Sequence, residues 1–144
     1  MKVVDQIKVR GYHVDNFRHV NNARYLEFFE DGRWAYTELN RHVGKLFMDL
    51  HKKGIIHVVV NININYRKGA AVGDILRIET DIMKADSKSY TMLQKAFLGD
   101  SKTVAVDAEV VNVFIDREAE KLIEINEKII NGWPELGKLL GKGD

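Results

Sequence analysis

The sequence predicts an α+β fold, in which an antiparallel β-sheet packs around one long central helix. Three observations predict it. A segment with the helical spacing of apolar residues follows a first short strand, and four segments with strand-like alternation come after it. Turns of hairpin length separate those four strands, so we expect consecutive strands to be neighbours in one sheet.

The composition is that of a single globular domain spanning residues 1–144. Hydrophobic residues make up 45% of the chain and charged residues 30%, and the lone proline gives no sign of a linker. The formal net charge of +1 argues against nucleic acid as a partner. The chain has no cysteine, which excludes a disulfide framework, a Cys-ligated metal and a thiol nucleophile. With no apolar signal segment and no apolar run of about 18 residues, we expect a cytoplasmic protein without stable membrane insertion.

The first third of the chain is expected to form a strand, a loop and a helix. Residues 3–12 predict a short strand, and the polar, aromatic-rich residues 11–22 that overlap its end predict a structured loop. Asn21 or Asn22 suits the N-cap of the following helix. One face of that helix carries its apolar side chains, Tyr25, Phe29, Tyr36 and Leu39. Gly32 lies on the same face at a cost of about 1 kcal/mol in helix propensity, so we expect another segment to approach it closely.

The rest of the chain is expected to consist mainly of strands. A second helix over residues 45–53 ends at Gly54. The strands that follow cover residues 55–66, 75–85, 90–98 and 103–115. In the first of these, Val60, Ile62, Ile64 and Tyr66 face one way, and Asn61, Asn63 and Asn65 face the other. A helical tail over residues 126–140 is broken at Pro134.

Two segments carry a resemblance to a known family. The first combines Tyr12, Asp15, the run His19-Val20-Asn21-Asn22 and Tyr25, and the second is the Asn61-x-Asn63-x-Asn65 strand. Together they resemble the acyl-CoA thioesterases of the 4-hydroxybenzoyl-CoA thioesterase superfamily, and within it most closely the FadM-type long-chain acyl-CoA thioesterases. The resemblance extends to about residue 115. It implies the hotdog fold, in which the sheet wraps around a single long helix.

Asp15 is the first candidate catalytic residue. Thioester hydrolysis needs a base that activates water, or a nucleophile that attacks the carbonyl carbon. Because the chain has no cysteine and no Gly-x-Ser-x-Gly motif, a carboxylate is the natural candidate for either role. The resemblance implies that Asp15 reaches the thioester, while helix N-terminal amides near Asn22 and Ala23 hold the carbonyl oxygen. The alternative is that Asp15 only closes a turn of the loop.

The other residues of this motif each keep two interpretations. His19 is a catalytic candidate that orients Asp15 or a water molecule, or else a histidine packed within the loop. Asn22 is a catalytic candidate through its amide, although both asparagines suit helix caps better than catalytic side chains. Tyr12 and Tyr25 are candidate substrate-binding residues, and the helical spacing of Tyr25 also suits the core.

The remaining substrate-binding candidates are Asn61, Asn63, Arg67 and Lys88. The two asparagines either face solvent or, as the resemblance implies, hydrogen-bond across a dimer near the active site, where this edge strand pairs with its twin. Arg67 and Lys88 are cations that suit the phosphates of CoA, although exposed cations at turns usually contact only solvent.

The resemblance implies hydrolysis of acyl-CoA, with long fatty acyl chains, to a free fatty acid and CoA. It also implies a homodimer or homotetramer with active sites between subunits, and neither a metal nor another cofactor. A hotdog enoyl-CoA hydratase or dehydratase is an alternative, but its Asp and His have a different spacing, with an Asn-Pro nearby. A non-catalytic acyl-CoA-binding module is a second alternative. A thioester of acyl-carrier protein is an alternative substrate.

Overall fold

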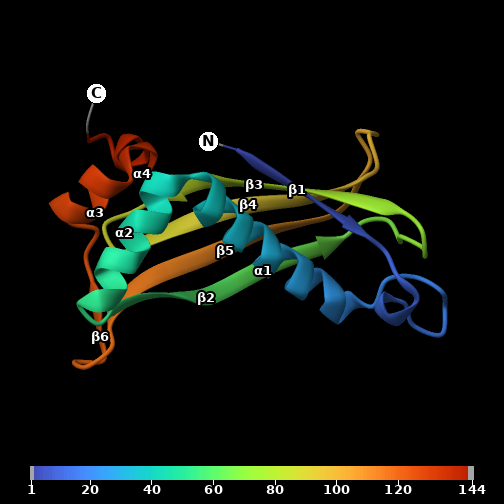
Figure 1. Cartoon of the computed structure of the whole chain (residues 1–144), viewed down its shortest axis with the longest axis horizontal. Helices are drawn as coiled ribbons and strands as arrows, with labels where there is room; N and C mark the ends of the chain where they lie inside the picture. Colours follow the sequence, from blue (N-terminus) through green and yellow to red (C-terminus); the bar gives the residue numbers. More distant parts are fainter. Residues whose placement is uncertain (1, 143–144) are drawn as a thin grey trace.

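One antiparallel sheet forms the frame of the molecule, and the helices lie against it (Figure 1). The computed structural model describes residues 2–142, and within them six strands join in the order β1-β3-β4-β5-β2, with β6 paired to β5. The strands are β1 (Val3–Lys8), β2 (Ile55–Tyr66), β3 (Ile75–Ala85), β4 (Ser89–Leu98), β5 (Val104–Asp116) and β6 (Lys121–Ile123). The helices are α1 (Asn22–Leu39), α2 (Arg41–Lys52), α3 (Glu127–Gly132) and α4 (Pro134–Leu139), besides a 3-10 turn at Gly11–His13. The predicted α+β architecture is confirmed.

The order of the strands differs from the expectation at one point. Strands β3, β4 and β5 pair consecutively, as predicted, but β2 pairs with β5 and lies at the edge of the main strand order. The expectation that β2 neighbours β3 was wrong, because β1 occupies that side of β3, with Val3 opposite Thr80. Residues 67–74 therefore cross from one side of the sheet to the other instead of forming a hairpin. Strand β6 was not predicted, and the first predicted strand extends beyond Lys8, where β1 ends.

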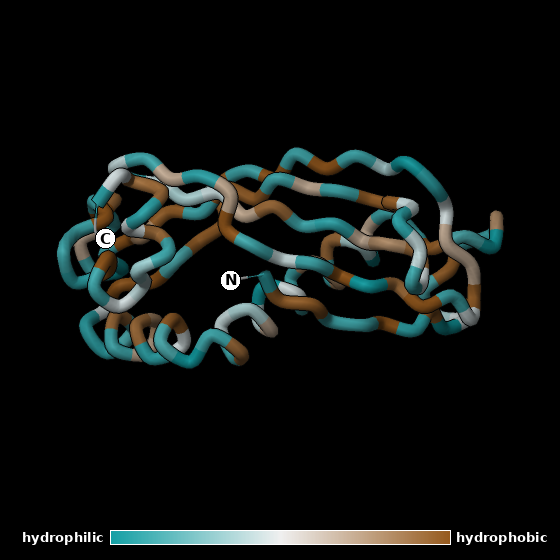
Figure 2. The backbone as a smooth tube through the Cα atoms, turned by 90° about the horizontal axis from the view of Figure 1, so that it is seen from above, coloured by the Kyte–Doolittle hydropathy of each residue, from teal (hydrophilic) through white to brown (hydrophobic). Residues whose placement is uncertain are grey.

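Strand β2 has a bulge that changes which side chains face α1. Its register against β5 shifts between Val59 and Asn61, so Val60 is the extra residue and is 56% exposed. Ile62 and Ile64 pack against the buried cluster that includes residues of α1, as predicted. Hydrophobic and hydrophilic residues alternate along the extended segments (Figure 2). The predicted two-faced strand is confirmed except at Val60, where the bulge interrupts the alternation.

Helix α1 packs tightly against the sheet at Gly32. A Cβ atom there would lie 2.9 Å from Ile78 Cγ2 and 3.0 Å from Gln94 Nε2, so the predicted close approach is confirmed and the neighbour is the sheet. The buried residues of α1 are Tyr25, Phe28, Phe29, Gly32 and Tyr36. Leu39, expected on that face, is exposed because α1 ends there and the chain turns at Asn40 into α2.

The C-terminal segment forms two short helices, as predicted. The side chain of Asn126 accepts from the amide of Ile129 at 3.1 Å and caps α3, and Pro134 begins α4. Trp133 between them is buried against Tyr36, Phe47 and Tyr90. Helices α2, α3 and α4 gather at one end of the sheet (Figure 1). Within residues 2–142, no helix is both long enough and apolar enough to span a bilayer.

Candidate active site

The loop before α1 is closed on itself and tied to a second segment. Val14 and Val20 form an isolated antiparallel bridge, and the amide of Asn21 donates to a carbonyl of the loop at 2.9 Å. The amide of Val20 donates to the carbonyl of Ala70, also at 2.9 Å, which joins the loop to the β2–β3 connection. Asp15 follows the bridge directly and lies within this closed loop, seven residues before Asn22, where α1 begins.

The carboxylate of Asp15 is exposed and closes a turn. Its Oδ1 accepts from the amide of Phe17 at 2.8 Å, and its own amide donates to the carbonyl of His19 at 3.0 Å. Arg18 has a φ of 64°, in the left-handed region, where the loop reverses direction. The turn-closing interpretation is therefore correct for Oδ1. No protein donor among residues 2–142 binds Oδ2, which is open to water or to a ligand.

The N-terminus of α1 leaves one particular amide unpaired. Asn21 is the N-cap, as its residue type predicts: its side chain accepts from the amide of Ala23 at 3.0 Å, and its carbonyl accepts from the amide of Arg24 at 2.9 Å. The amide of Asn22 has no hydrogen-bond acceptor within the described part of the chain. Of the two amides expected to hold a carbonyl oxygen, that of Ala23 is used by the cap and that of Asn22 is available.

Two tyrosines pack against this end of α1. The hydroxyl of Tyr66 donates to the carbonyl of Asn22 at 3.2 Å, and the rings of Tyr66 and Tyr25 lie 5.9 Å apart. The hydroxyl of Tyr25 is buried and has no partner among residues 2–142. Burial, with smaller contributions from the charge of Asp74 and from Tyr66, raises the pKa of Tyr25 to about 12. Tyr25 is thus a protonated core residue beside the candidate site.

The histidines of the loop have different surroundings. The ring of His19 packs on Gly69, where a Cβ atom would lie 3.0 Å from its Cγ, and no side-chain bond to Asp15 is found within residues 2–142. His13 is buried, and its Nδ1 accepts from the amide of Arg10 at 2.9 Å. Sequence reasoning missed this structural role of His13. Tyr12 is 71% exposed and meets α1 through its carbonyl, which accepts from Arg24.

The asparagines of β2 lie on the face of the sheet opposite to α1. Asn61 and Asn63 are exposed there, so one chain does not bring them to Asp15. Asn65 donates to Asp107 Oδ1 at 3.2 Å, and Arg67 Nε donates to the other oxygen of the same carboxylate. Arg67 is thereby held by Asp107 at the end of β2 that carries Tyr66.

Lys88 lies far from Asp15 within the chain. It occupies the β3–β4 turn, where Asp86 accepts from its amide at 2.8 Å. The segment before β3 is joined to the Asp15 loop, because the amide of Val20 donates to the carbonyl of Ala70. The β3–β4 turn lies at the other end of β3, where the carbonyl of Ser87 accepts from the amide of Ile125. The eleven residues of β3 separate the two ends by roughly 36 Å. Lys88 could therefore serve the site only from a second chain.

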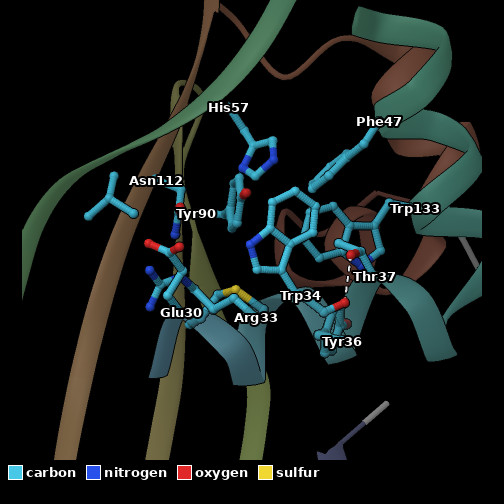
Figure 3. A pocket seen from close by; sticks show the side chains of 12 residues that line it. Glu30, Arg33, Trp34, Tyr36, Thr37, Phe47, His57, Tyr90, Asn112 and Trp133 are labelled. Atoms are coloured by element: carbon cyan, nitrogen blue, oxygen red, sulfur yellow. Dashed lines mark hydrogen bonds between the residues drawn. The ribbon is translucent and has the colours of Figure 1, made fainter. Parts of the chain in front are cut away.

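A pocket of about 240 Å³ lies beside the C-terminal half of α1 (Figure 3). Its walls come from α1, α2, β2, β4, β5 and the α3–α4 junction. The lining residues are Glu30, Arg33, Trp34, Tyr36, Thr37, Phe47, His57, Val59, Tyr90, Met92, Asn112 and Trp133. Sequence reasoning missed this pocket. One signal was present in Asn112, a polar residue within the apolar run 110–115. Among residues 2–142, no group of three His, Asp or Glu side chains is arranged to hold a metal ion.

Known proteins resemble this chain in sequence and in fold. The chain is 41% identical over 128 residues to the long-chain acyl-CoA thioesterase FadM of Escherichia coli (strain K12), covering 86% of this chain and 94% of FadM. The crystal structure of the E. coli protein YbaW superposes with a TM-score of 0.83 at 37% identity, covering 92% of this chain and 97% of YbaW. The Staphylococcus aureus protein SAV2348, solved in complex with CoA, shares the fold alone, with a TM-score of 0.79 at 16% identity over 100% of this chain and 89% of its own. The thioesterase-like superfamily model matches residues 9–132. The chain belongs to this superfamily and has its hotdog fold.

Proposed function

We propose that the protein hydrolyses long-chain fatty acyl-CoA to a free fatty acid and CoA. The observation that carries the proposal is that the closed loop with an open carboxylate oxygen leads directly into a helix whose first amide is unused. Asp15 lies in the closed loop, and the amide of Asn22 opens α1 without an acceptor. The 41% identity to FadM supports the same reaction and the same class of acyl chain.

The two groups divide the chemistry of hydrolysis between them. The Asn22 amide, at the positive end of the α1 dipole, donates to the thioester oxygen as negative charge develops on it. Asp15 takes a proton from water while the water oxygen bonds to the carbonyl carbon, the carbon–sulfur bond breaks, and the proton passes to the CoA sulfur. In the nucleophilic alternative, Asp15 attacks the carbonyl carbon directly and water then hydrolyses the resulting anhydride.

In this proposal the acyl chain lies along the side of α1 that faces β2. At one end Tyr66 binds the carbonyl of Asn22, and at the other His57 and Val59 line the pocket together with Arg33. The eleven residue-to-residue steps from Asn22 to Arg33 span about 16 Å of helix. An extended chain advances about 1.2 Å per bond, so this distance corresponds to about 14 bonds. The separation supports a long-chain substrate.

The proposal includes a homo-oligomer, either a dimer or a tetramer. Strand β2 is an edge strand of twelve residues, and such an edge is normally covered. Pairing β2 with its twin would place Asn61 and Asn63 at the interface, and a second chain could bring Lys88 to the CoA phosphates. The location proposed is the cytoplasm, since a cysteine-free chain has no disulfides to require an oxidising compartment. No metal or other cofactor enters this reaction scheme.

The test is thiol release from acyl-CoAs of increasing chain length by the native protein and by Asp15→Asn. Asparagine keeps an oxygen that can accept from Phe17, so the turn is preserved while the base is lost. We expect kcat to fall at least about 100-fold, a typical general-base contribution. Asp116→Asn is the matched control, because Asp116 also closes a turn, with Glu118 and Ala119, but lies outside the site. Near-native kcat in folded Asp15→Asn would refute the mechanism, and binding without thiol release by the native protein would indicate a binding module.

A further inference from the structure

We propose that the pocket beside α1 selects acyl groups that carry an uncharged oxygen, such as a hydroxyl, near the end remote from the thioester. This rests on the proposed function. The pocket is walled largely by aromatic rings, of Trp34, Tyr36, Phe47, Tyr90 and Trp133. Its volume of about 240 Å³ exceeds the roughly 150 Å³ of an apolar cavity that takes up benzene. The pocket therefore has room for several carbons at the end of a chain.

The guanidinium of Arg33 is fixed at the wall of this pocket by a buried amide. Gln94 is 0% exposed, and its Nε2 donates to the carbonyl of Phe29 at 2.8 Å and to Thr80 Oγ1 at 2.9 Å. Its Oε1 accepts from Arg33 Nη1 at 2.9 Å. The orientation of the Gln94 amide is thus determined by two acceptors, and it determines in turn where the guanidinium lies. Such a preorganised donor is typical of a binding site rather than of a solvent-facing arginine.

Arg33 has unused hydrogen-bonding capacity. A guanidinium carries five N–H groups, and no partner other than Gln94 is found for it among residues 2–142. Glu30 also lines the pocket, one turn before Arg33, but the two do not form an ion pair within 4.0 Å. A partly buried guanidinium with a single neutral partner is favourable only if another acceptor, from water or ligand, reaches it.

Other polar groups meet at the same side of the pocket. Figure 3 shows the side chains of Glu30, Arg33 and Asn112 lying together, with His57 and Tyr90 beside them. Asn112 is buried and uses its Nδ2 to donate to the carbonyl of Val110, which leaves its Oδ1 without a partner within residues 2–142. The ring of Tyr90 is also buried, and no hydrogen bond of its hydroxyl is found there. A plain hydrocarbon end would exclude water from these groups without replacing its hydrogen bonds, whereas a hydroxyl both donates and accepts.

The charges at the pocket favour a neutral oxygen over a carboxylate. Glu30 and Arg33 bring opposite charges to the same wall. Burial, and next the charge of Arg33, lower the pKa of His57, so this ring is neutral at neutral pH. Together these side chains carry no excess positive charge that would compensate a buried carboxylate. With about 14 bonds between the Asn22 amide and Arg33, the matching substrate has a hydroxyl at or near carbon 14 to 16.

The experiment compares kcat/KM for 16-hydroxyhexadecanoyl-CoA with that for hexadecanoyl-CoA, and 3-hydroxyhexadecanoyl-CoA serves as the control for the position of the hydroxyl. We expect the native protein to prefer the 16-hydroxy substrate by about tenfold, and to show no such preference for the 3-hydroxy substrate. In Arg33→Met and in Tyr90→Phe this preference should fall to about one. Arg117→Met, which removes an exposed arginine that does not line the pocket, should keep this preference.

If Arg33→Met fails to fold, Tyr90→Phe still tests whether the pocket recognises the hydroxyl, because this substitution removes only a hydroxyl from the protein. Equal kcat/KM for the 16-hydroxy and the plain substrate would overturn the inference while leaving the proposed thioesterase intact. So would an unchanged preference in both folded variants. A stronger preference for hexadecanedioyl-CoA would overturn the assignment to an uncharged oxygen. Absence of thiol release from every one of these substrates would refute the proposed function itself, and the inference with it.

Discussion

Gly32 of α1 lies so close to Thr80 of β3 that a Cβ atom at Gly32 would come within 2.9 Å of Thr80 Oγ1. We predict that Gly32→Val destabilises the fold by about 1–3 kcal/mol, the range for overpacking a well-filled core. The measurement is urea unfolding of the two proteins. Gly11→Ala is the control, because a Cβ atom at Gly11 meets nothing within 4 Å. A native-like unfolding midpoint for Gly32→Val would show that α1 can move away from the sheet at little cost.

Asn21→Ala should affect both stability and activity. Loss of the N-cap typically costs about 1 kcal/mol, and the same loss is expected for Asn126→Ala at the N-cap of α3. Only Asn21→Ala should also lower kcat, since only α1 presents its first amides to the candidate site. The two variants are compared by chemical unfolding and by thiol release. Equal kcat in both would argue against the α1 N-terminus as the oxyanion site.

Tyr66→Phe tests whether the hydroxyl that binds the carbonyl of Asn22 positions the first turn of α1. One such hydrogen bond contributes about 0.5–1.5 kcal/mol, so we expect kcat to fall about two- to tenfold with little change in KM. Steady-state kinetics on a long-chain acyl-CoA measure the effect. A rise in KM at constant kcat would assign Tyr66 to substrate binding instead.

Stability should decrease on mild acidification because of His13. Burial, and then the charge of Arg24, lower the pKa of His13 below its ordinary value, so the unfolded chain binds a proton that the native state does not. The contribution of His13 to the free energy of unfolding is complete above its pKa in the unfolded chain, near 6.5. It is lost as the pH falls from there toward the lower pKa of His13 in the native state. One proton contributes at most about 1.4 kcal/mol per pH unit. Unfolding followed from pH 8 to pH 5 should show this decrease, and a smaller one in His13→Asn; identical slopes would contradict the assignment.

The oligomer is tested by its mass. A dimer paired through β2 should scatter light as about twice the 16.5 kDa of one chain at micromolar concentration. Asn63→Pro removes an amide from β2 and should weaken either the β2–β5 ladder or the subunit contact. Far-ultraviolet circular dichroism separates the two effects, because only the first disturbs the sheet of a single chain. A native mass of one chain would reject the dimer.

Local signals in the sequence were sufficient for most of the secondary structure. Asn21, Asn126 and Pro134 act on the residues directly beside them, and the helices begin where these residues predict. The neighbour of β2 could not be predicted in the same way, because it depends on β1 occupying the side of β3, seventy residues away along the chain. Turn length alone does not contain that information.

In the candidate site, too, the sequence predicts local features but not the contacts between distant residues. The motif made Asp15 and Asn22 candidates, but which amide is free follows from a side-chain bond between Asn21 and Ala23 that only the structure reveals. The pocket beside α1 was missed because its residues extend from Glu30 to Trp133 and share no spacing. The exposure of Asn61 and Asn63 on the opposite face leaves their predicted role to a second chain.

In the proposed binding mode, the length of helix α1 between the Asn22 amide and Arg33 sets the length of the acyl chain. Removing one residue between them would shorten the distance by about 1.5 Å but rotate every later side chain by about 100°. Removing about seven residues, nearly two whole turns, would keep the same face toward β2 and shorten the chain by roughly nine carbons. Deletions in α1 would therefore change the preferred acyl-chain length only in large steps. Smaller changes in the preferred length would require substitutions in the side chains at the far wall of the pocket.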